Sequence, residues 1–301
     1  MHRECDLSII TVNYNGLKDT CELIDTIPSN DLSLEVIVVD NGSTDNEAEV
    51  IATRYPFVKT IRSEKNLGFA GGNNLGIEKS VGKYLFLINN DTLLWKDEAG
   101  KDTITSQLQS LIDRLNSSPS IGIVCPKLRF AWGNYPIQFA GYTPLSSITM
   151  RNHAIGYGEE DNHQYDQPHP TPYAHGAAMM IKREALEAVG PMPECYFLYY
   201  EELDWSAMFT CSGYEIWYEP QCTVYHKESQ ATGQDSPLKT YYITRNRLLY
   251  VKRNVKHLSK YVTILYLMTV VFLRDIPKYA FRGRTDLIKA ASRGIRDFFT
   301  L

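Results

Sequence analysis

The sequence predicts an α/β protein with a doubly wound, Rossmann-like and mostly parallel sheet. Three β-branched, apolar runs end in polar residues: LSIITVNYN (7–15), LEVIVVDNGSTD (34–45) and KYLFLINND (83–91). Continuous rather than alternating hydrophobicity is typical of strands that are buried on both faces. Helical patterns separate these runs, and strands that alternate with helices indicate parallel pairing through crossovers.

The remaining elements follow in order along the chain. In the first half we expect helices at 20–27, 46–55, 68–80 (entered by a glycine-rich turn) and 103–116, and a further strand at 58–64. In the second half we expect a strand at 121–130, a strand and helix within 176–190, a helix at 201–214 and a strand at 215–226. The segment 131–172 is rich in Pro, Gly, His and Tyr, which predicts loops shaped for a ligand.

The composition is that of a globular protein, with 44% hydrophobic and 22% charged residues. The six cysteines (5, 21, 125, 195, 211 and 222) include no CxxC pair, which favours reduced thiols over a disulfide framework or a zinc site. The chain starts directly in a strand pattern, so no signal peptide is expected, and no apolar run reaches the roughly 20 residues of a membrane span. We therefore expect a cytoplasmic protein.

The charge of the C-terminal region differs from that of the whole chain. Residues 238–301 hold fourteen Lys/Arg and three Asp/Glu, although the net charge of the chain is −4. The same region contains the apolar run YVTILYLMTVVFL (261–273). One interpretation is a buried helix with solvated basic flanks. The interpretation that we favour is a helix lying on an anionic membrane surface.

These observations predict two parts. Residues 1–237 form the first part, which has a regular α/β pattern up to about residue 120 and a less regular pattern from about 121 to 237. Residues 238–301 form an amphipathic helical extension.

Two polar motifs follow strands in the first half. Asp40 ends a buried strand, where its carboxylate can accept a hydrogen bond from the N3–H of uracil or thymine. The alternative is that the segment after it only caps a helix. In NLGFAGGNNLG (66–76) the glycines can bring the backbone close to a phosphate or sugar. Their spacing is not G-x-G-x-x-G and they follow the third strand, so a dinucleotide site is not favoured.

The next strand ends in Asn89, Asn90 and Asp91. The functional interpretation is a divalent cation held by Asp91, with Asn89 as an oxygen ligand or outer-shell group. Mg²⁺ accepts one or two carboxylates and takes its other oxygens from water and substrate phosphates. His226, at the tip of a later strand, is a plausible further ligand. The alternative is a polar strand end followed by a turn.

The segment FLYYEELDWS (197–206) places Glu201, Glu202 and Asp204 at the start of a helix. An exposed acidic helix start would only complement the helix dipole. The aromatic residues before it and Trp205 after it argue against a solvated face. Carboxylates in a partly apolar cleft are candidates for general-base catalysis.

Taken together, the motifs resemble the family 2 glycosyltransferases, which are inverting enzymes of the GT-A fold, and especially bacterial rhamnosyltransferase-like members. The ordered matches are SIITVNYN, VIVVDNGSTD, NLGFAGGNNLG, YLFLINNDT, GAAMMIKREAL, YYEELDW, a strand ending in VYH, and YYITRNRLLY, over residues 6–250. The resemblance implies that Asp40 reads the nucleotide base, that Asp91 and His226 hold the metal, and that Glu202 is the catalytic base. Asn89 departs from the family's Asp-x-Asp motif, and Glu202 stands where Asp is commoner.

The resemblance therefore implies that residues 1–237 form the catalytic domain, with a nucleotide-binding half at about 1–120 and an acceptor half at about 121–237. It also implies four groups of site residues. The catalytic group is Glu202, supported by Glu201 and Asp204, and the metal group is Asp91, His226 and Asn89. The nucleotide-sugar group is Thr11, Asn13, Asn15, Asp40, Asn41, Gly42, Asn66, Gly68, Gly71, Gly72, Asn73, Asn90, Asp91 and Arg245, and the acceptor group is His175, Gly176, Ala177 and Trp205. Arg245 is equally well explained as a basic residue on lipid.

The expected activity is metal-assisted, inverting transfer of a hexose from a dTDP- or UDP-sugar, with rhamnose as one candidate sugar. The expected acceptor is a hydroxyl of a glycan or lipid-linked molecule in cell-surface polysaccharide synthesis. Mg²⁺ or Mn²⁺ is the expected cofactor, the inner membrane face the expected location, and no nucleic acid is expected as a partner. A nucleotidyltransferase is an alternative, but TVNYNGLKDT (11–20) lacks its Gly-rich, basic loop. A non-catalytic carbohydrate- or membrane-binding scaffold is a second alternative.

Overall fold

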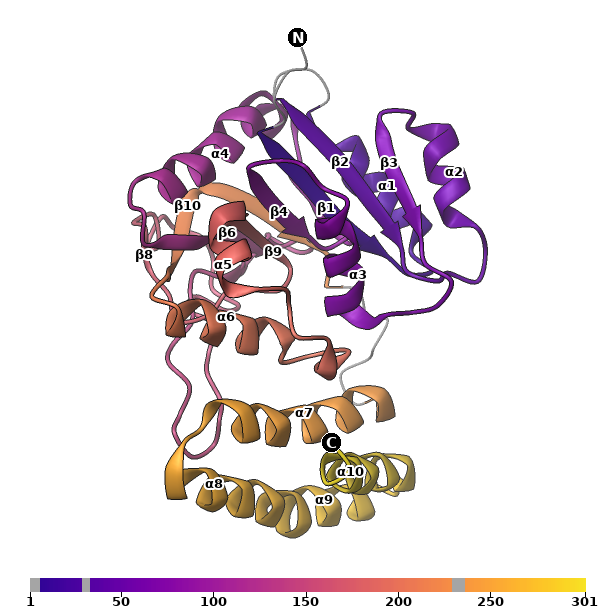
Figure 1. Ribbon diagram of the computed structural model, residues 1–301, viewed down its shortest axis with the longest axis vertical. Coiled ribbons are helices and arrows are strands. Elements are labelled where there is room, and N and C mark those ends of the chain that lie inside the picture. Colours follow the sequence, from indigo (N-terminus) through magenta and orange to yellow (C-terminus); the bar gives the residue numbers. More distant parts are fainter. Residues whose placement is uncertain (1–5, 29–32, 229–235) are drawn as a thin grey trace.

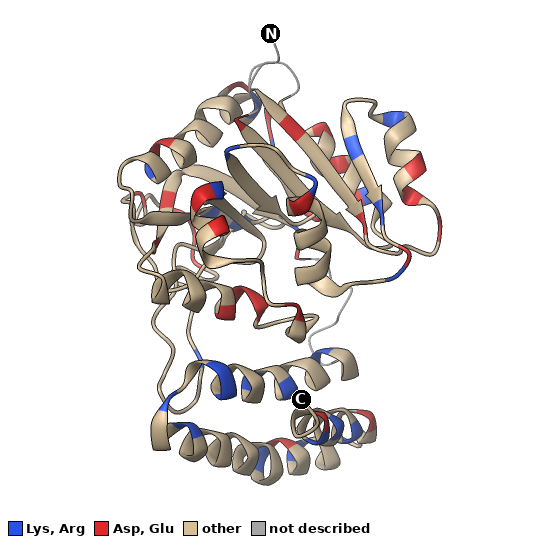
Figure 2. Ribbon diagram, in the orientation of Figure 1, with Lys and Arg blue, Asp and Glu red and all other residues tan. Residues whose placement is uncertain are grey.

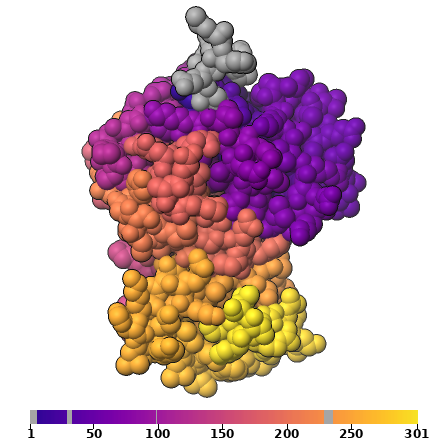
Figure 3. Space-filling view, in the orientation of Figure 1, coloured from indigo at the N-terminus to yellow at the C-terminus, as the bar shows by residue number. Residues whose placement is uncertain are grey.

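The computed structural model of the chain describes residues 6–28, 33–228 and 236–301. A twisted ten-stranded sheet carries helices on both of its faces, and four C-terminal helices stack beneath one end of this unit (Figure 1). In the space-filling view these four helices form a lobe of their own below the sheet (Figure 3). The predicted α/β class, with a mostly parallel sheet and a helical C-terminal region, is confirmed.

The strands are β1 (Leu7–Asn13), β2 (Leu34–Asp40), β3 (Val58–Arg62), β4 (Tyr84–Ile88), β5 (Thr92–Leu93), β6 (Ile121–Phe130), β7 (Ile137–Phe139), β8 (His169–Pro170), β9 (Ala178–Lys182) and β10 (Glu215–His226). The helices are α1 (Leu17–Asp25), α2 (Glu47–Arg54), α3 (Gly68–Glu78), α4 (Glu98–Asn116), α5 (Arg183–Val189), the 3₁₀ turn η1 (Glu194–Tyr196), α6 (Glu201–Cys211), α7 (Pro237–Asn254), α8 (His257–Val270), the π-helical segment η3 (Val271–Asp275), α9 (Ile276–Phe281) and α10 (Thr285–Phe298). The expected helix 103–116 begins earlier because Asp97 caps it, accepting a hydrogen bond from Gly100 N at 2.9 Å.

The strand order places a crevice at the middle of the sheet. The order is β3-β2-β1-β4-β9-β6-β10-β5, with β3, β2, β1 and β4 parallel and β9 antiparallel to both of its neighbours. The chain runs outward from β1 to β3 and then returns to the other side of β1 as β4. In open α/β sheets, ligands bind at the carboxyl ends of the strands where the order reverses in this way. The tips of β1, β2 and β4 therefore define the place to look for a site.

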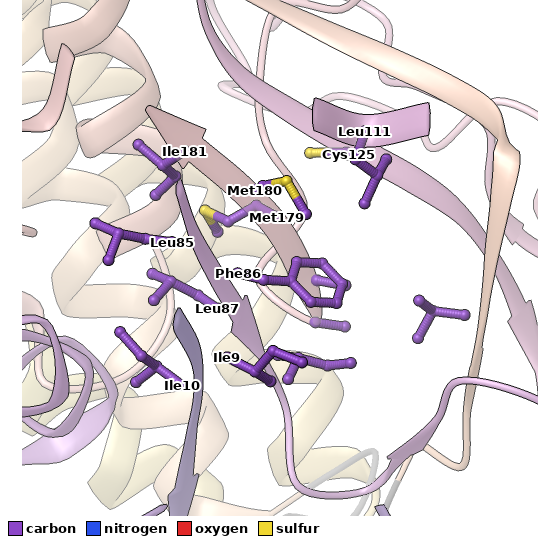
Figure 4. Close-up of a cluster of buried hydrophobic side chains, with 14 of the residues drawn as sticks. Ile9, Ile10, Leu85, Phe86, Leu87, Leu111, Cys125, Met179, Met180 and Ile181 are labelled. Atoms are coloured by element: carbon purple, nitrogen blue, oxygen red, sulfur yellow. The ribbon is translucent and has the colours of Figure 1, made fainter. Parts of the chain in front are cut away.

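The main core lies on the two faces of this sheet. The side chains of Val36–Val39 are at most 1% exposed, as expected for a strand buried on both faces. Figure 4 shows Ile9, Ile10, Phe86, Met180 and neighbouring side chains of β1, β4 and β9 in contact across the central strands. Burying a side chain of this size stabilises the fold by roughly 1.5–3 kcal/mol.

The glycines of α3 allow this helix to approach β1 closely. A Cβ on Gly72 would lie 2.8 Å from Val12 Cγ1, and one on Gly76 would overlap Ile10 Cγ2. Alternate residues of a strand point to opposite faces, so α3 covers the face that carries Ile10 and Val12. On the other face, the Thr20 hydroxyl of α1 donates to Asn13 Oδ1 at 2.7 Å. The two helices thus lie on opposite sides of β1.

A second apolar core joins the C-terminal helices to the loop that precedes α6. Tyr196 and Tyr200 of this loop are buried with Leu248 and Val251 of α7. Leu267, Ile295 and Phe298 complete the core from α8 and α10. The helices of residues 238–301 are therefore held to the catalytic part by a shared core.

The run 261–273 is neither wholly buried nor wholly exposed. Thr263 and Leu267 face the protein, whereas Leu258, Leu265 and Leu273 are 75%, 68% and 75% exposed. Lys and Arg recur along α7, α8, α9 and α10 (Figure 2). Within the part of the chain that the structure describes, no helix combines the length and apolarity needed to cross a membrane.

Candidate active site

A cavity of about 360 Å³ opens at the predicted crevice. Seven of the residues that line it belong to the predicted donor and metal groups: Asn41, Asn66, Gly68, Asn73, Asn89, Asn90 and Asp91. Val12, Tyr14, Phe69, Ile88, Phe197, Leu198 and Leu238 form the rest of the wall. An apolar wall with a few convergent polar groups is typical of small-molecule sites.

Asp91 and His226 come together at the edge of this cavity. His226 Nε2 lies 3.2 Å from Asp91 Oδ1, because β10 pairs with β5 directly after the tip of β4. The other ring nitrogen of His226, Nδ1, lies 2.9 Å from Gln138 Oε1. An amide oxygen only accepts hydrogen bonds, so Nδ1 carries a proton and Nε2 is directed at the carboxylate. The third predicted ligand, Asn89, lines the same cavity.

The other two residues of the strand tip are fixed by neighbouring elements. The backbone N–H of Asn89 donates to Ala177 O at 2.9 Å, which joins the tip of β4 to the start of β9. The Asn90 amide donates to the Thr20 hydroxyl of α1 at 3.0 Å. Among the described residues, no three His, Cys, Asp or Glu side chains are grouped closely enough to hold a metal ion.

Asp40 is engaged with the start of α2. Its buried carboxylate accepts hydrogen bonds from the backbone N–H groups of Ser43 (3.1 Å) and Ala48 (3.3 Å), and the Arg62 guanidinium lies 4.0 Å away. These are the contacts that the capping alternative predicts. Base reading by Asp40 stays a prediction, and Asp40 itself does not line the cavity.

Asn41 shapes the cavity wall. Its Oδ1 accepts from Leu67 N at 3.0 Å, and its Nδ2 donates to Gly68 O at 3.0 Å and to Asn66 Oδ1 at 3.2 Å. Gly68 has a φ of 77°, and a Cβ at this position would collide with the Phe197 carbonyl. The start of α3 therefore rests on the loop before α6.

The other predicted donor residues support the walls of the cavity and do not line it. The buried Thr11 hydroxyl has no hydrogen-bond partner among the described residues. Asn13 donates to Glu47 at 2.6 Å, and Asn15 accepts from Thr44 N at 2.9 Å. Gly42, Gly71 and Gly72 lie in close contact with Lys65, Leu67 and Val12, respectively.

The two glutamates at the start of α6 differ in environment. Glu201 is 3% exposed, and its Oε2 has no hydrogen-bond partner in the described part of the chain. Burial, and then the charge of Glu202, hold the pKa of Glu201 well above its ordinary range. Burial also raises the pKa of Glu202, which is only partly exposed. Glu201 is the more deeply buried of the two carboxyls, so burial disfavours its ionised form more strongly, and Glu202 is the better placed to act as a carboxylate.

Gly176 is the point where the cavity meets α6. A Cβ on this glycine would lie 3.8 Å from Glu202 Cγ and 3.9 Å from Phe69 Cζ. Phe69 lines the cavity and Glu202 does not, so Gly176 joins the Glu202 side chain to the wall of the cavity. Ala177, the next residue, is the one that receives the Asn89 hydrogen bond. The predicted acceptor residues Gly176 and Ala177 are therefore placed between the strand tip and the acidic helix.

His175 is held as a neutral imidazole. Burial, and then the proximity of His226, lower its pKa to about 3. Its Nδ1 accepts from Ala177 N at 3.1 Å, and its ring stacks on Tyr142 with 5.8 Å between centroids. Burial, and then the charge of Glu202, raise the pKa of the Tyr142 hydroxyl. Tyr142 is thus a residue of the 131–172 region that lies close to Glu202.

Asp204 and Trp205 do not face the cavity. Asp204 accepts from Arg253 Nε at 2.6 Å and from Asn254 Nδ2 at 2.5 Å, and it is buried against α7. Two helical residues that are two positions apart point about 200° from each other, so Asp204 and Glu202 diverge. Trp205 is 1% exposed and donates to Gly190 O at 2.9 Å. Neither position supports the catalytic or acceptor role expected from the sequence.

The loop before α6 is strained and is held by α7. Phe197, Tyr199 and Tyr200 have φ values of 67°, 68° and 78°, a region that bulky residues rarely adopt. The side-chain amide of Asn246, which is fully buried, shares its two N–H groups among the carbonyls of Tyr196 (3.0 Å), Leu198 (2.7 Å) and Tyr199 (2.8 Å). These contacts hold the residues that lead directly into Glu201 and Glu202.

Arg245 supports the same loop as its neighbour Asn246. Its guanidinium donates to the carbonyls of Cys195 at 3.1 Å and Tyr196 at 2.6 Å. The sequence predicted a phosphate contact or a lipid contact for Arg245. In the structure its guanidinium supports the loop before α6. Sequence reasoning missed Asn246, although a polar residue between two arginines in the helical segment TRNRLLY was an available signal.

Comparisons with known proteins identify the family of the chain. Residues 8–190 match the family described as Glycosyl transferase family 2. The chain is 28% identical over 256 residues to the low-salt glycan biosynthesis hexosyltransferase Agl10 of Haloferax volcanii, covering 81% of this chain and 75% of that protein. It is 24% identical over 218 residues to the N-acetylglucosaminyl-diphospho-decaprenol L-rhamnosyltransferase of Mycobacterium tuberculosis, covering 67% and 69%.

Solved glycosyltransferase structures share the fold. The mannosyltransferase PcManGT of Pyrobaculum calidifontis, in complex with GDP-Man and Mn²⁺, superposes with a TM-score of 0.55 at 17% identity over 96% of this chain and 74% of its own. The TarS 1–349 structure from S. aureus gives 0.53 at 15% identity, over 95% and 81%. At these identities the likeness concerns the fold alone.

The family match decides between the activities considered above. It covers more than half of the chain and includes nearly all of β1, the tips of β2 and β4, most of the cavity wall and β9. Neither a nucleotidyltransferase nor a non-catalytic scaffold is supported by these relatives. The chain belongs to glycosyl transferase family 2 and is a glycosyltransferase.

Proposed function

We propose that the protein transfers a hexose, with inversion, from a dTDP- or UDP-sugar to a hydroxyl of a lipid-linked glycan acceptor in cell-surface polysaccharide synthesis. The observation that carries this proposal is the convergence at Gly176. There the donor-side cavity, through Phe69, meets the carboxyl of Glu202.

The donor set at the strand tip fits a divalent cation. Nε2 of His226 and Oδ1 of Asp91 face each other at 3.2 Å, and Gln138 orients the imidazole from behind. Two protein ligands are enough for Mg²⁺ or Mn²⁺ when a diphosphate supplies further oxygens. Asp91 and His226 would hold the ion, with Asn89 beside them. Such an ion, when bound, neutralises the negative charge that develops on the leaving diphosphate.

The chemical step uses Glu202 as the general base. Its carboxylate removes the proton from the acceptor hydroxyl while the hydroxyl oxygen forms a bond to the anomeric carbon. The bond between that carbon and the diphosphate oxygen breaks, and the nucleoside diphosphate leaves from the opposite face. A positioned base accelerates such a step by about 10²–10⁴-fold, and orientation of the reactants lowers the barrier by roughly 7–11 kcal/mol.

The acceptor class is supported by the C-terminal surface. Leu258, Leu265, Leu273 and Phe281 form an exposed apolar surface along α8, η3 and α9, and Phe281 is 96% exposed. With the basic residues of the same region, this surface fits an anionic membrane. The Mycobacterium relative is named for a diphospho-decaprenol acceptor. We therefore place this enzyme peripherally on the inner membrane face, acting on an acceptor anchored in the membrane.

A second copy of the chain fits the apolar surface less well. A two-fold dimer contact joins the same patch of both subunits. It would bring Lys256 and Lys260 of one copy near the equivalent lysines of the other, and residues 238–301 contain only three carboxylates. Like charges across such a contact oppose association.

A screen of nucleotide sugars tests the proposed activity. Thermal shift and donor hydrolysis would be measured with dTDP-, UDP- and GDP-sugars, each with Mg²⁺, Mn²⁺ or EDTA. We expect stabilisation and slow hydrolysis with a dTDP- or UDP-sugar that depend on the cation. A preference for GDP-sugars, or equal stabilisation in EDTA, would contradict the proposed donor and metal.

A further inference from the structure

A second cavity lies on the far side of the loop before α6, outside the donor site. It measures about 230 Å³ and lies between α7 and the segment from α8 to α9. Five cationic side chains line it: Arg151, Lys239, Arg247, Arg274 and Lys278. They come from three separate parts of the chain, which are the loop at Arg151, α7 and the run η3–α9, so the fold and not a local charge run brings them together.

Little negative charge balances these cations. The one carboxylate that lines the cavity, among the residues described, is Asp275, and it pairs with Arg274 at 2.7 Å. Arg151, Lys239 and Lys278 make no ion pair within the described part of the chain. Like charges around a concave surface favour a bound anion, and the guanidinium fork of arginine matches phosphate oxygens.

Apolar side chains line the same cavity beside the cations. Leu267, Val270 and Val271 contribute from α8 and η3, and Ile243 and Leu248 contribute from α7. A ligand that suits this mixed lining carries a phosphate or diphosphate group next to a hydrocarbon chain. A free inorganic anion would leave the apolar side chains without a partner.

The cavity and the exposed apolar surface lie on opposite sides of α8. On a helix, Leu267 is about 180° from the direction shared by Leu258 and Leu265. If the exposed side of α8 rests on a bilayer, the cavity lies on the opposite side of this helix. Its distance from the bilayer contact is then about one helix diameter, 10–12 Å. The headgroup region of a bilayer is roughly 5–8 Å thick, so a phosphate attached to a membrane lipid stands close to this height.

The cavity is also connected to the catalytic helix. Arg247 lines the cavity, and its Nε donates to the hydroxyl of Tyr200 at 2.8 Å. Tyr200 directly precedes Glu201 and Glu202 at the start of α6. A ligand held here would therefore lie near the acceptor side of the active site and not on the donor side.

We propose that the cavity between α7 and η3–α9 binds the diphosphate of an isoprenoid-linked acceptor, with Lys239, Arg247 and Lys278 as its anion-binding residues. This proposal rests on the proposed function for its acceptor class. It adds the site at which the anchor of the acceptor is recognised.

The test is a binding measurement that contains no nucleotide sugar. Farnesyl diphosphate, a soluble isoprenyl diphosphate, would be titrated calorimetrically into the full-length protein in EDTA, so that no cation at Asp91 recruits the diphosphate. The cavity variant is Lys239→Gln/Lys278→Gln. The matched control is Lys256→Gln/Lys260→Gln, which removes the same charge from α8 outside the cavity. We expect the cavity variant to bind roughly tenfold or more weakly, and the control within about twofold of the wild type.

Two further arms separate the sources of phosphate. Inorganic pyrophosphate tests a free anion, and flotation with phosphatidylglycerol vesicles tests an ordinary lipid headgroup. Pyrophosphate that binds as tightly as farnesyl diphosphate would overturn the isoprenoid assignment. A cavity variant that loses vesicle binding but keeps farnesyl diphosphate binding would also overturn the isoprenoid assignment.

Equal losses in both variants, or no farnesyl diphosphate binding at all, would overturn the site itself. Thermal midpoints identify a misfolded cavity variant. In that event Arg151→Gln, a surface substitution on the other wall, replaces it. Failure of this experiment leaves donor hydrolysis unaffected, so it is distinguishable from failure of the proposed function.

Discussion

The two sides of the active site are built in different ways. The strand-tip side, with Asp91, His226 and Asn89, rests on the ends of β4 and β10 within the buried sheet. The α6 side, with Glu201 and Glu202, follows a loop with three residues at positive φ that is held by Asn246 from far along the chain. The strand-tip side is formed by the sheet itself, whereas the α6 side depends on contacts from the C-terminal helices. The family match ends at residue 190 and so includes only part of this machinery.

The largest expected effect separates the two glutamates of α6. Glu202→Gln removes the general base, so transfer should fall by about 10²–10⁴-fold with nucleotide affinity unchanged. Glu201→Gln is the matched control, because Glu201 is buried and protonated and the amide resembles a neutral carboxyl. Transfer kinetics and nucleotide titrations check both variants. If Glu202→Gln keeps more than a few per cent of the activity, the base is another group.

The next prediction concerns the strand-tip side alone. Gln138→Ala removes the hydrogen-bond partner of His226, which should weaken divalent-cation affinity by roughly 10–100-fold while Glu202 is untouched. Asp91→Ala should abolish the effect of EDTA on donor binding. Donor affinity would be measured across a Mn²⁺ titration. A normal Mn²⁺ dependence in both variants would exclude a metal at this strand tip.

Breaking the support of the loop tests whether the α6 side depends on α7. Asn246→Ala removes the donor that the carbonyls of Tyr196, Leu198 and Tyr199 share, although Tyr196 O keeps its hydrogen bond from Arg245, and the loss should cost about 1–3 kcal/mol of unfolding free energy. Because Phe197 also lines the donor cavity, both kcat and the donor KM should change. Denaturant unfolding and steady-state kinetics give the two readouts. Asp204→Asn, which removes the charge that pairs with Arg253 and keeps an amide oxygen that can accept from Asn254, is the control and should leave kcat nearly unchanged.

The smallest effect is a pH dependence on the α6 side. Transfer needs ionised Glu202, so kcat/KM should fall as the pH drops through a pKa that burial holds above the ordinary value of 4.5. The pH dependence of the unfolding free energy has the opposite sign to that of kcat/KM. The folded protein binds more protons than the unfolded chain between 4.5 and the raised pKa values, so unfolding free energy is lost as the pH rises through this window. A pH–rate profile and thermal midpoints of Glu201→Gln check both statements.

The sequence was sufficient for features that depend on local pattern. Buried apolar runs predicted the central strands. The polar residues that end these runs predicted that Asp91 and Asn89 lie at the carboxyl edge of the sheet. Other features depend on residues that only the fold brings together. Gln138 and Asn246 act on residues 88 and about 50 positions away. Asp204 was expected in the site because it shares a helix turn with Glu201, but an ion pair with α7 turns it away.

The glycines of α3 have a consequence for the dynamics of the donor site. Each glycine within a helix costs roughly 1 kcal/mol of helix propensity, and α3 contains four of them. In isolation this segment is a poor helix, and contact with β1 is what keeps it folded. Amide hydrogen exchange in α3 should therefore report how firmly the wall of the cavity is docked, and a bound nucleotide sugar should slow it more than it slows exchange in α4.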